Sequence, residues 1–333
     1  MKRHAQRGAA LLIAMLTVAL VATFAAASLW QQWRSVEVET AERARVQSTW
    51  ILTGALDWAR LLLREDKMGS GATAADHLGE PWAIPLQEAK LSSFLAADAN
   101  NTSTDLTPDV MDAFLSGQIV DMQSKMNINN MMKGDGGGLD EAQVEAFGRL
   151  FEILGLPGSE LAKLAENLRF AATSAVTQSA QAPLMPQRLS DLVWLGISPQ
   201  TIAVLEPYVT VLRGQSPKLN VNTAAPEAIA AATGISISEA QRMVQVRTAA
   251  YFTSVPDFQA HLAGGASEVP ESQRYPIDIA SHFFEVRARL RLDKIVVEEH
   301  SLVEVNGTSV TVLRRERGSG GPDVASAGPP PQR

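Results

Sequence analysis

The sequence predicts an α+β protein in which a long N-terminal helix packs on an antiparallel sheet and a large α-helical domain is inserted between strands of that sheet. Three observations support this fold class. Residues 9–33 carry no charge, strand-like alternation occurs at 116–132 and again at 282–316, and the intervening chain has helical patterns. Pieces of one sheet that lie so far apart indicate a discontinuous domain with an insertion.

Length and composition are those of a folded protein with room for two domains. The chain has 333 residues, of which 46% are hydrophobic and 20% charged, and its net charge is −7. Three positive charges lie within residues 1–8, which leaves −10 on the remainder. An acidic body argues against nucleic acid as a partner, because affinity for it depends on Lys and Arg. Without cysteine there is no disulfide, and the compartment stays open.

The first element expected is a membrane-spanning helix over residues 9–30. These 22 residues would form a helix about 33 Å long, which is enough to cross a bilayer. The basic residues before it predict a cytoplasmic N-terminus. The run is long for the core of a secretory signal. Small residues at 24–28 nevertheless leave open cleavage before Ser28 and ordinary secretion.

The same helix is expected to continue beyond the membrane. Ile51, Ala55, Trp58 and Leu62 recur at helical spacing, and neither Pro nor Gly occurs between Ala9 and Thr53. One helix is therefore predicted from the membrane to about residue 70, amphipathic in its second half.

The next segments alternate between extended and helical patterns. Residues 76–85 are expected to form a loop, and 86–114 give no clear pattern. Residues 116–132 are predicted to form a strand and then a second extended piece in which Met126 and Ile128 alternate with asparagines. The glycine-rich run at 133–138 indicates a hinge without a phosphate-loop ending, and 139–168 are expected to be helical.

Residues 218–258 resemble a helix-hairpin-helix unit, with Thr223 as a candidate N-cap and Pro226 in the first turn. The net charge of residues 218–262 is zero, and the turn between the helices lacks the second glycine that would let backbone amides approach a phosphate. A packing role is therefore favoured over DNA binding.

The last elements are three strands. Apolar and charged residues alternate over 284–292, a second strand is expected over 295–305, and Asn306-Gly307 predicts a hairpin turn into a third strand over 308–316. The Gly- and Pro-rich end predicts a disordered tail.

The sequence offers no catalytic constellation. Its five histidines have no metal-ligand spacing, and it has neither a cysteine nucleophile nor a Gly-x-Ser-x-Gly motif. Asp57, Asp66 and Asp76 are interpreted as solvated helix and loop charges. We therefore expect a protein that is not an enzyme and needs no cofactor.

Two motifs carry a resemblance to a known family. "QRG" before "AALLIAMLTVAL" resembles a type IV prepilin leader, and the pattern Gly, apolar, Asp, x, Gln followed by Asn-x-Asn is similar to that of the K-type minor pseudopilins of type II secretion (general secretion pathway protein K). The resemblance implies peptidase cleavage between Gly8 and Ala9 and N-methylation of Ala9. It places Ile13 at the fifth mature position, where pilins have a glutamate that the K type lacks.

The resemblance also implies a domain organisation. Residues 1–8 would be the leader and 9–30 the transmembrane part of the helix. Residues 31–132 and 281–316 would form the discontinuous pseudopilin domain, 133–280 the inserted helical domain, and 317–333 the disordered tail.

The function implied is that of a structural subunit at the pseudopilus tip that promotes pseudopilus assembly. The implied partners are the I-type and J-type minor pseudopilins, the prepilin peptidase, and the inner-membrane assembly platform. The body would be periplasmic on a single-pass inner-membrane anchor. The candidate partner contact is the apolar helix face at Trp50, Ile51, Ala55 and Trp58. The alternative is an anchored or secreted helix-hairpin-helix module that binds DNA, as in competence systems.

Calcium is the one metal that the resemblance raises. K-type members usually carry an acidic run in the inserted domain, but residues 167–190 of this chain contain no acid. We therefore predict no metal site in that run. Weak candidates elsewhere are Asp98, Asp105, Asp135 and Asp140.

Overall fold

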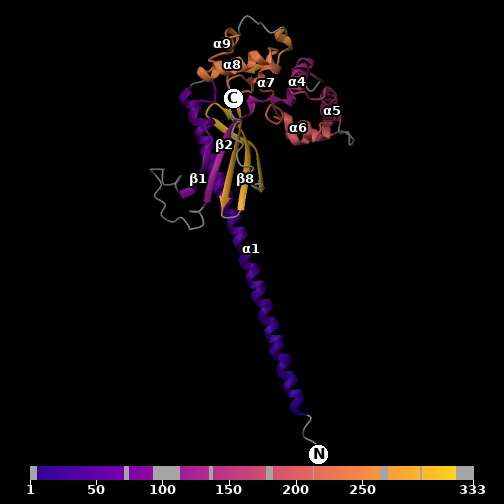
Figure 1. Cartoon of the computed structure of the whole chain (residues 1–333), viewed down its shortest axis with the longest axis vertical. Helices are drawn as coiled ribbons and strands as arrows, with labels where there is room; N and C mark the ends of the chain where they lie inside the picture. Colours follow the sequence, from indigo (N-terminus) through magenta and orange to yellow (C-terminus); the bar gives the residue numbers. More distant parts are fainter. Residues whose placement is uncertain are drawn as a thin grey trace, which may run out of the picture.

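The computed structural model describes residues 6–70, 75–92, 113–134, 138–177, 183–212, 214–262, 269–292 and 295–319. It confirms the predicted fold class, with a long N-terminal helix, an antiparallel sheet and an inserted group of helices. Figure 1 shows helix α1 projecting from the body as a straight rod, with the inserted helices gathered at the opposite end of the sheet.

Helix α1 spans Gln6–Ser70 and changes character along its length. Residues 9–43 are exposed, and an 18-residue window near the N-terminus has a mean hydropathy of 2.4, enough by length and composition to cross a membrane. Burial begins at Ser48. From there Leu52, Leu56, Ala59 and Leu63 form one helical stripe that packs on the sheet.

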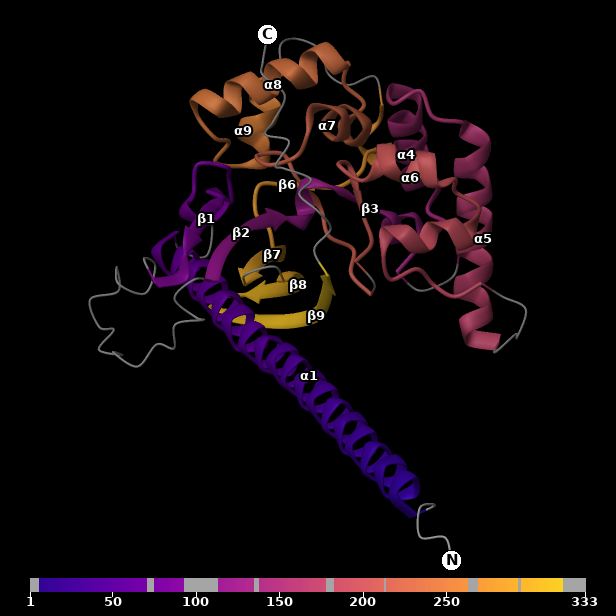
Figure 2. The same cartoon turned by 60° about the horizontal axis from the view of Figure 1, so that its bottom comes forward.

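Five antiparallel strands form the sheet in the order β1-β2-β7-β8-β9. Their bounds are Leu86–Lys90, Ala113–Asp121, Phe283–Leu292, Ile295–Asn306 and Ser309–Ser319. Strand β2 pairs with β7 along its whole length, although residues 122–282 lie between them. The insertion therefore leaves the sheet at the end of β2 and returns at the start of β7, as Figure 2 shows.

The C-terminal strands follow the predicted alternation. Along β7, buried and half-buried residues alternate from Phe284 onward, with the apolar side toward α1. The β8–β9 turn has Gly307 at φ +57°, a conformation that favours glycine. Strand β9 continues to Ser319, so the prediction that the tail begins at residue 317 is wrong. The rest of that tail lies outside the described residues.

The prediction of a second extended piece after β2 is also wrong. Residues Met122–Ser124 and Ile128–Met131 form 3-10 turns around the two-residue strand β3, Met126–Asn127. The Asn127 side chain accepts a hydrogen bond from the backbone N–H of Asn129 and starts the second turn. Such local side-chain bonds compete with strand geometry, and Asn127 is as fully buried as Met126 and Ile128, so burial does not alternate here.

The inserted domain consists of short helices around one apolar core. They are α4 (Glu141–Ile153), α5 (Gly158–Thr177), a 3-10 helix (Leu189–Leu195), α6 (Pro199–Leu205), α7 (Pro226–Thr233), α8 (Ile237–Ala249) and α9 (Val255–Ala260). Phe147, Phe151 and Ile229 are buried in this core. The predicted helical stretch 139–168 is interrupted before α5, where Gly155 has φ +65°.

The insertion also contains two short parallel strand pairs. Strand β3 pairs with β4 (Val209–Thr210), and β5 (Leu219–Asn220) pairs with β6 (Ile277–Asp278). Pro226 occupies the first turn of α7 as predicted, but the N-cap is Ala225 and not Thr223. The Thr223 hydroxyl instead donates to Asp121.

Candidate functional site

An apolar groove runs along the exposed side of α1 where the helix meets the sheet. Its volume is about 400 Å³, and α1, the 3-10 turn Pro81–Ala83, β1, β2 and β7 contribute to its walls. Trp50 and Ile84 at its rim are 73% and 69% exposed. Large apolar side chains left this open beside a cavity are typical of a protein-protein contact.

The structure brings all four predicted contact residues to this groove, but it gives them different surroundings. Ile51 and Ala55 are half-buried and pack on the sheet core. Trp50 and Trp58 remain exposed, Trp58 to 42%. The face thus both packs on its own sheet and presents two tryptophans outward.

Gly54 lies between the two tryptophans on the same side of the helix. A Cβ atom built there would have no atom within 4 Å outside its own stretch of helix. A mid-helix glycine costs about 1 kcal/mol relative to alanine, and no neighbour among the described residues requires the space. The opening above Gly54 would let another helix or a large side chain approach the α1 backbone closely.

The predicted processing site lies at the start of α1. The helix begins at Gln6, so Gly8 and Ala9 belong to its first turns, whereas residues 1–5 lie outside the described part. Ile13 is 62% exposed on the apolar part of the helix. Cleavage and methylation here remain predictions.

A buried polar network joins the pseudopilin-like sheet to the inserted domain; we call it the junction. Its centre is Asp121, whose Oδ2 accepts hydrogen bonds from the Thr223 and Ser281 hydroxyls at 2.5 and 2.7 Å and from Asn220 Nδ2 at 3.2 Å. The Asn220 amide also donates to the backbone carbonyl of Asp76 at 3.0 Å. The motif at 117–129 and the first residues of the helix-hairpin-helix-like unit, 220–223, therefore meet in space and join the sheet to the inserted domain.

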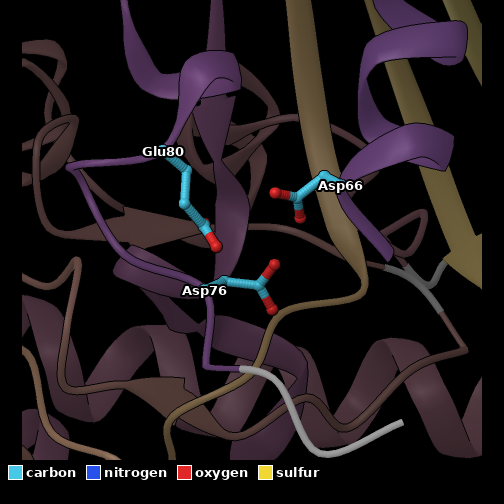
Figure 3. A group of neighbouring side chains, drawn as sticks. All are labelled: Asp66, Asp76 and Glu80. Atoms are coloured by element: carbon cyan, nitrogen blue, oxygen red, sulfur yellow. The ribbon is translucent and has the colours of Figure 1, made fainter. Parts of the chain in front are cut away.

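Acidic side chains gather next to the junction. Figure 3 shows Asp66 at the end of α1 facing Asp76 and Glu80 from the following loop, and carboxylate oxygens of the three lie within 4.8 Å of one another. Asp76 is 1% exposed, so the interpretation of Asp76 as a solvated charge is wrong. Burial raises the pKa of Glu80 to about 7, and burial followed by repulsion from Asp76 raises the pKa of Asp66.

This cluster is the one group in the described ranges whose carboxylates could surround a cation. Lys67 Nζ already lies 2.5 and 2.6 Å from the two carboxylate oxygens of Asp76, so the protein itself supplies a counter-charge. We therefore assign no metal ligands here. Of the predicted metal candidates, Asp98, Asp105 and Asp135 fall outside the described residues. Asp140 caps α4 by accepting from the N–H groups of Ala142 and Gln143.

Calcium is expected to stabilise this protein little. Glu166, the last acid before the acid-free run, lies exposed on α5, and the described part of that run offers no carboxylate to replace the hydration shell of the ion. A site saturated at 100 times its dissociation constant would add about 2.7 kcal/mol and raise the melting temperature by about 5–10 °C. Melts in millimolar calcium and in chelator should instead agree. A rise of several degrees would contradict the prediction and place ligands elsewhere in the chain.

The basic residues of the helix-hairpin-helix-like unit are engaged within the protein. Arg247 donates to the carbonyl of Val221 at 2.6 Å, and its burial lowers its pKa to about 10. Arg242 pairs with Glu239 at 2.5 Å, and Lys218 pairs with Asp278 at 3.1 Å. Cations held in this way are poorly placed to bind a phosphate backbone, which favours the packing role.

Sequence reasoning missed the junction carboxylates. Asp121 and Asp76 are 97% and 99% buried, yet their local sequence resembles ordinary loop and strand-end positions. Each also has a hydrogen-bond partner more than 90 positions away along the chain. The motif spacing could have singled out Asp121 but not Glu80.

Comparisons with known proteins agree on one family. Two family models, both described as type II secretion system protein K, match residues 124–214 and 219–278. The type II secretion system protein K of Pseudomonas aeruginosa is 26% identical, over 98% of this chain and 97% of its own length. That of Klebsiella pneumoniae is 24% identical, over 95% and 97%.

A solved structure has the same fold. A chain in the crystal structure of the GspK-GspI-GspJ complex from the type 2 secretion system of enterotoxigenic Escherichia coli superposes with a TM-score of 0.61. The two share 18% identity, and the match covers 84% of this chain and 99% of that one.

Proposed function

The chain belongs to the protein K family of type II secretion systems, whose members are minor pseudopilins, and from this premise we propose that it caps the tip of the pseudopilus and promotes its assembly. The proposed role is structural rather than enzymatic. Its direct partners would be the I-type and J-type minor pseudopilins, by analogy with the complex in which the structural neighbour was solved.

We propose a single-pass position in the inner membrane. Residues 9–30 would span the bilayer, with the basic N-terminus in the cytoplasm and the body in the periplasm. The prepilin peptidase would remove residues 1–8, and the inner-membrane assembly platform would receive the mature subunit.

Ile13 supports a position at the tip. A glutamate at the fifth mature position would compensate the N-terminal ammonium of a neighbouring subunit in the apolar core of a filament. An unpaired charge there is costly, and isoleucine offers no charge. A subunit with Ile13 can therefore end a filament but fits poorly within one.

The observation that carries the partner proposal is the groove beside Gly54. It lies on the same helix that would emerge from the membrane, beyond an exposed stretch that ends at residue 43. An N-terminal helix of a second pseudopilin leaving the membrane in parallel would reach this groove with its own apolar face. Trp50 and Trp58 would then flank it, as aromatic anchors do at protein interfaces.

Replacing Trp50 or Trp58 with glutamate should therefore abolish partner binding while the fold survives. A charge buried in an aromatic hot spot costs at least about 2 kcal/mol, which weakens binding about 30-fold or more. Residues 9–43 have no buried side chain, so a body lacking residues 1–30 keeps its core. Calorimetry with purified I-type and J-type bodies would measure the dissociation constant, and a thermal melt would report folding.

The matched control is Trp194→Glu. Trp194 is 57% exposed on the inserted domain and does not line the groove, so its replacement should leave binding unchanged. Equal loss of binding in all three variants would argue against the groove. Unfolding by Trp50→Glu, at a residue 73% exposed, would also contradict the proposed role of that side chain.

A further inference from the structure

The junction places four carboxyl groups where the two domains meet. Asp76 ties the segments together, because its Oδ2 accepts from the Ser281 N–H at 2.6 Å while its backbone carbonyl accepts from Asn220. Asp121 holds Asn220, Thr223 and Ser281 from the other side. Asp66 and Glu80 lie against Asp76 without joining these inter-domain bonds.

Positive charge at the junction is scarce. Lys67 is 15% exposed and is held at 2.5 Å by Asp76. Among the described residues, the other titratable groups that interact with the cluster are His77 and Asp121. His77 comes from the same loop and stacks on Tyr251 of the inserted domain with ring centroids 3.9 Å apart, and Asp121 comes from β2. One lysine thus faces several carboxylates in a buried site, where like charges repel strongly.

We propose that the junction is a proton-dependent latch between the inserted domain and the sheet with α1. When Glu80 and Asp66 are protonated, Lys67 stays paired with Asp76, and the hydrogen bonds between the domains are kept. When Glu80 and Asp66 ionise, they attract Lys67 away from Asp76, and these hydrogen bonds weaken. Ser281 and Asn220 are the residues released, because both depend on the position of Asp76. The trigger is the addition or loss of protons at neutral to mildly acidic pH.

The direction of the pH dependence follows from the carboxyl groups. Burial raises the pKa of Glu80 to about 7 and that of Asp121 to about 6, above their unfolded values. The folded state therefore holds protons that the unfolded state has lost, and stability falls as pH rises from about 4.5 through 7. Burial lowers the pKa of His77, and this makes the folded state more stable as pH rises. The effect of the carboxyl groups is therefore isolated by comparing the wild type with carboxyl variants that all keep His77.

The test is a thermal melt of the full chain in detergent micelles at pH 5.5 and pH 8. We expect the melting temperature of the wild type to fall by about 5 °C between these values, and that of Glu80→Gln to fall by half as much or less. Glu65→Gln changes an exposed carboxyl on α1, next to Asp66, and should behave as the wild type. An equal fall in Glu80→Gln and the wild type would overturn the latch.

Hydrogen exchange gives a local readout that a general loss of stability would not produce. Between pH 5.5 and 8, protection factors at residues 219–223 and 281–283 should fall about tenfold more than those of β8 in the wild type, and by the same factor as those of β8 in Glu80→Gln. Uniform loss across β8 and the junction would refute a local latch. Asp66→Asn, at a half-buried residue, repeats the comparison if Glu80→Gln does not fold.

Discussion

Replacing Gly8 with alanine or with a bulkier residue such as valine should leave the chain uncut, with its full N-terminus retained in the inner membrane. A peptidase that cuts after a glycine has no room for a side chain at that position, so we expect processing to be lost almost completely. Mass spectrometry of the N-terminus measures this directly. In the wild type it should find a methylated Ala9.

The control is the same substitution at the other end of the helix. Gly69→Ala lies in α1 with no atom within 4 Å of the added Cβ, and it should be processed normally. Each alternative to prepilin processing predicts a different N-terminal residue in the wild type. Ser28 would indicate ordinary secretion, and an intact Met1 would indicate a membrane anchor that is not cleaved. Normal cleavage of a Gly8→Val chain would refute the assigned site.

Asn127→Ala should destabilise the inserted domain more than any surface change. Asn127 is fully buried, and its side chain donates to the carbonyls of Leu212 and Gln215 and accepts from the Leu212 N–H at 2.8 Å. Alanine would remove this partner from the Leu212 N–H and from the Gln215 carbonyl, at about 1–3 kcal/mol each, whereas the Leu212 carbonyl would keep its bond from Asn129. We expect a loss of about 4 kcal/mol, seen as a fall of about 10 °C in melting temperature.

Asn167→Ala is the matched comparison. Asn167 is half-buried on α5, and within the described residues its side chain makes one hydrogen bond, from its Nδ2 to the carbonyl of Leu195 at 3.0 Å. Its loss should cost about 1 kcal/mol, measured by denaturant titration. If Asn127→Ala costs no more than Asn167→Ala, the buried asparagine is not what holds this part of the chain.

Local patterns determined most of the elements. A long charge-free run and the absence of Pro and Gly were enough to predict α1, because a membrane-spanning helix depends on composition and length. The alternation in β7 and the Asn306-Gly307 turn predicted the C-terminal hairpin, since period-2 burial and a positive φ are both properties of neighbouring residues. Of the groove residues, Ile51, Ala55 and Trp58 followed from helical spacing alone.

Tertiary contacts decided the junction and the chain around it. The local sequence of residues 126–131 predicts an extended piece, but the side chain of Asn127 bonds to Leu212 and Gln215 and the chain forms a 3-10 turn. The local sequence likewise predicts Thr223 as a helix cap, but its hydroxyl donates to Asp121. The local sequence around Asp76 indicates a solvated charge, but in the fold Asp76 is buried and bonded to Asn220 and Ser281. Whether a polar side chain is buried, and what its pKa then is, depends on partners brought from distant parts of the chain by the pairing of β2 with β7, and no local pattern encodes that pairing.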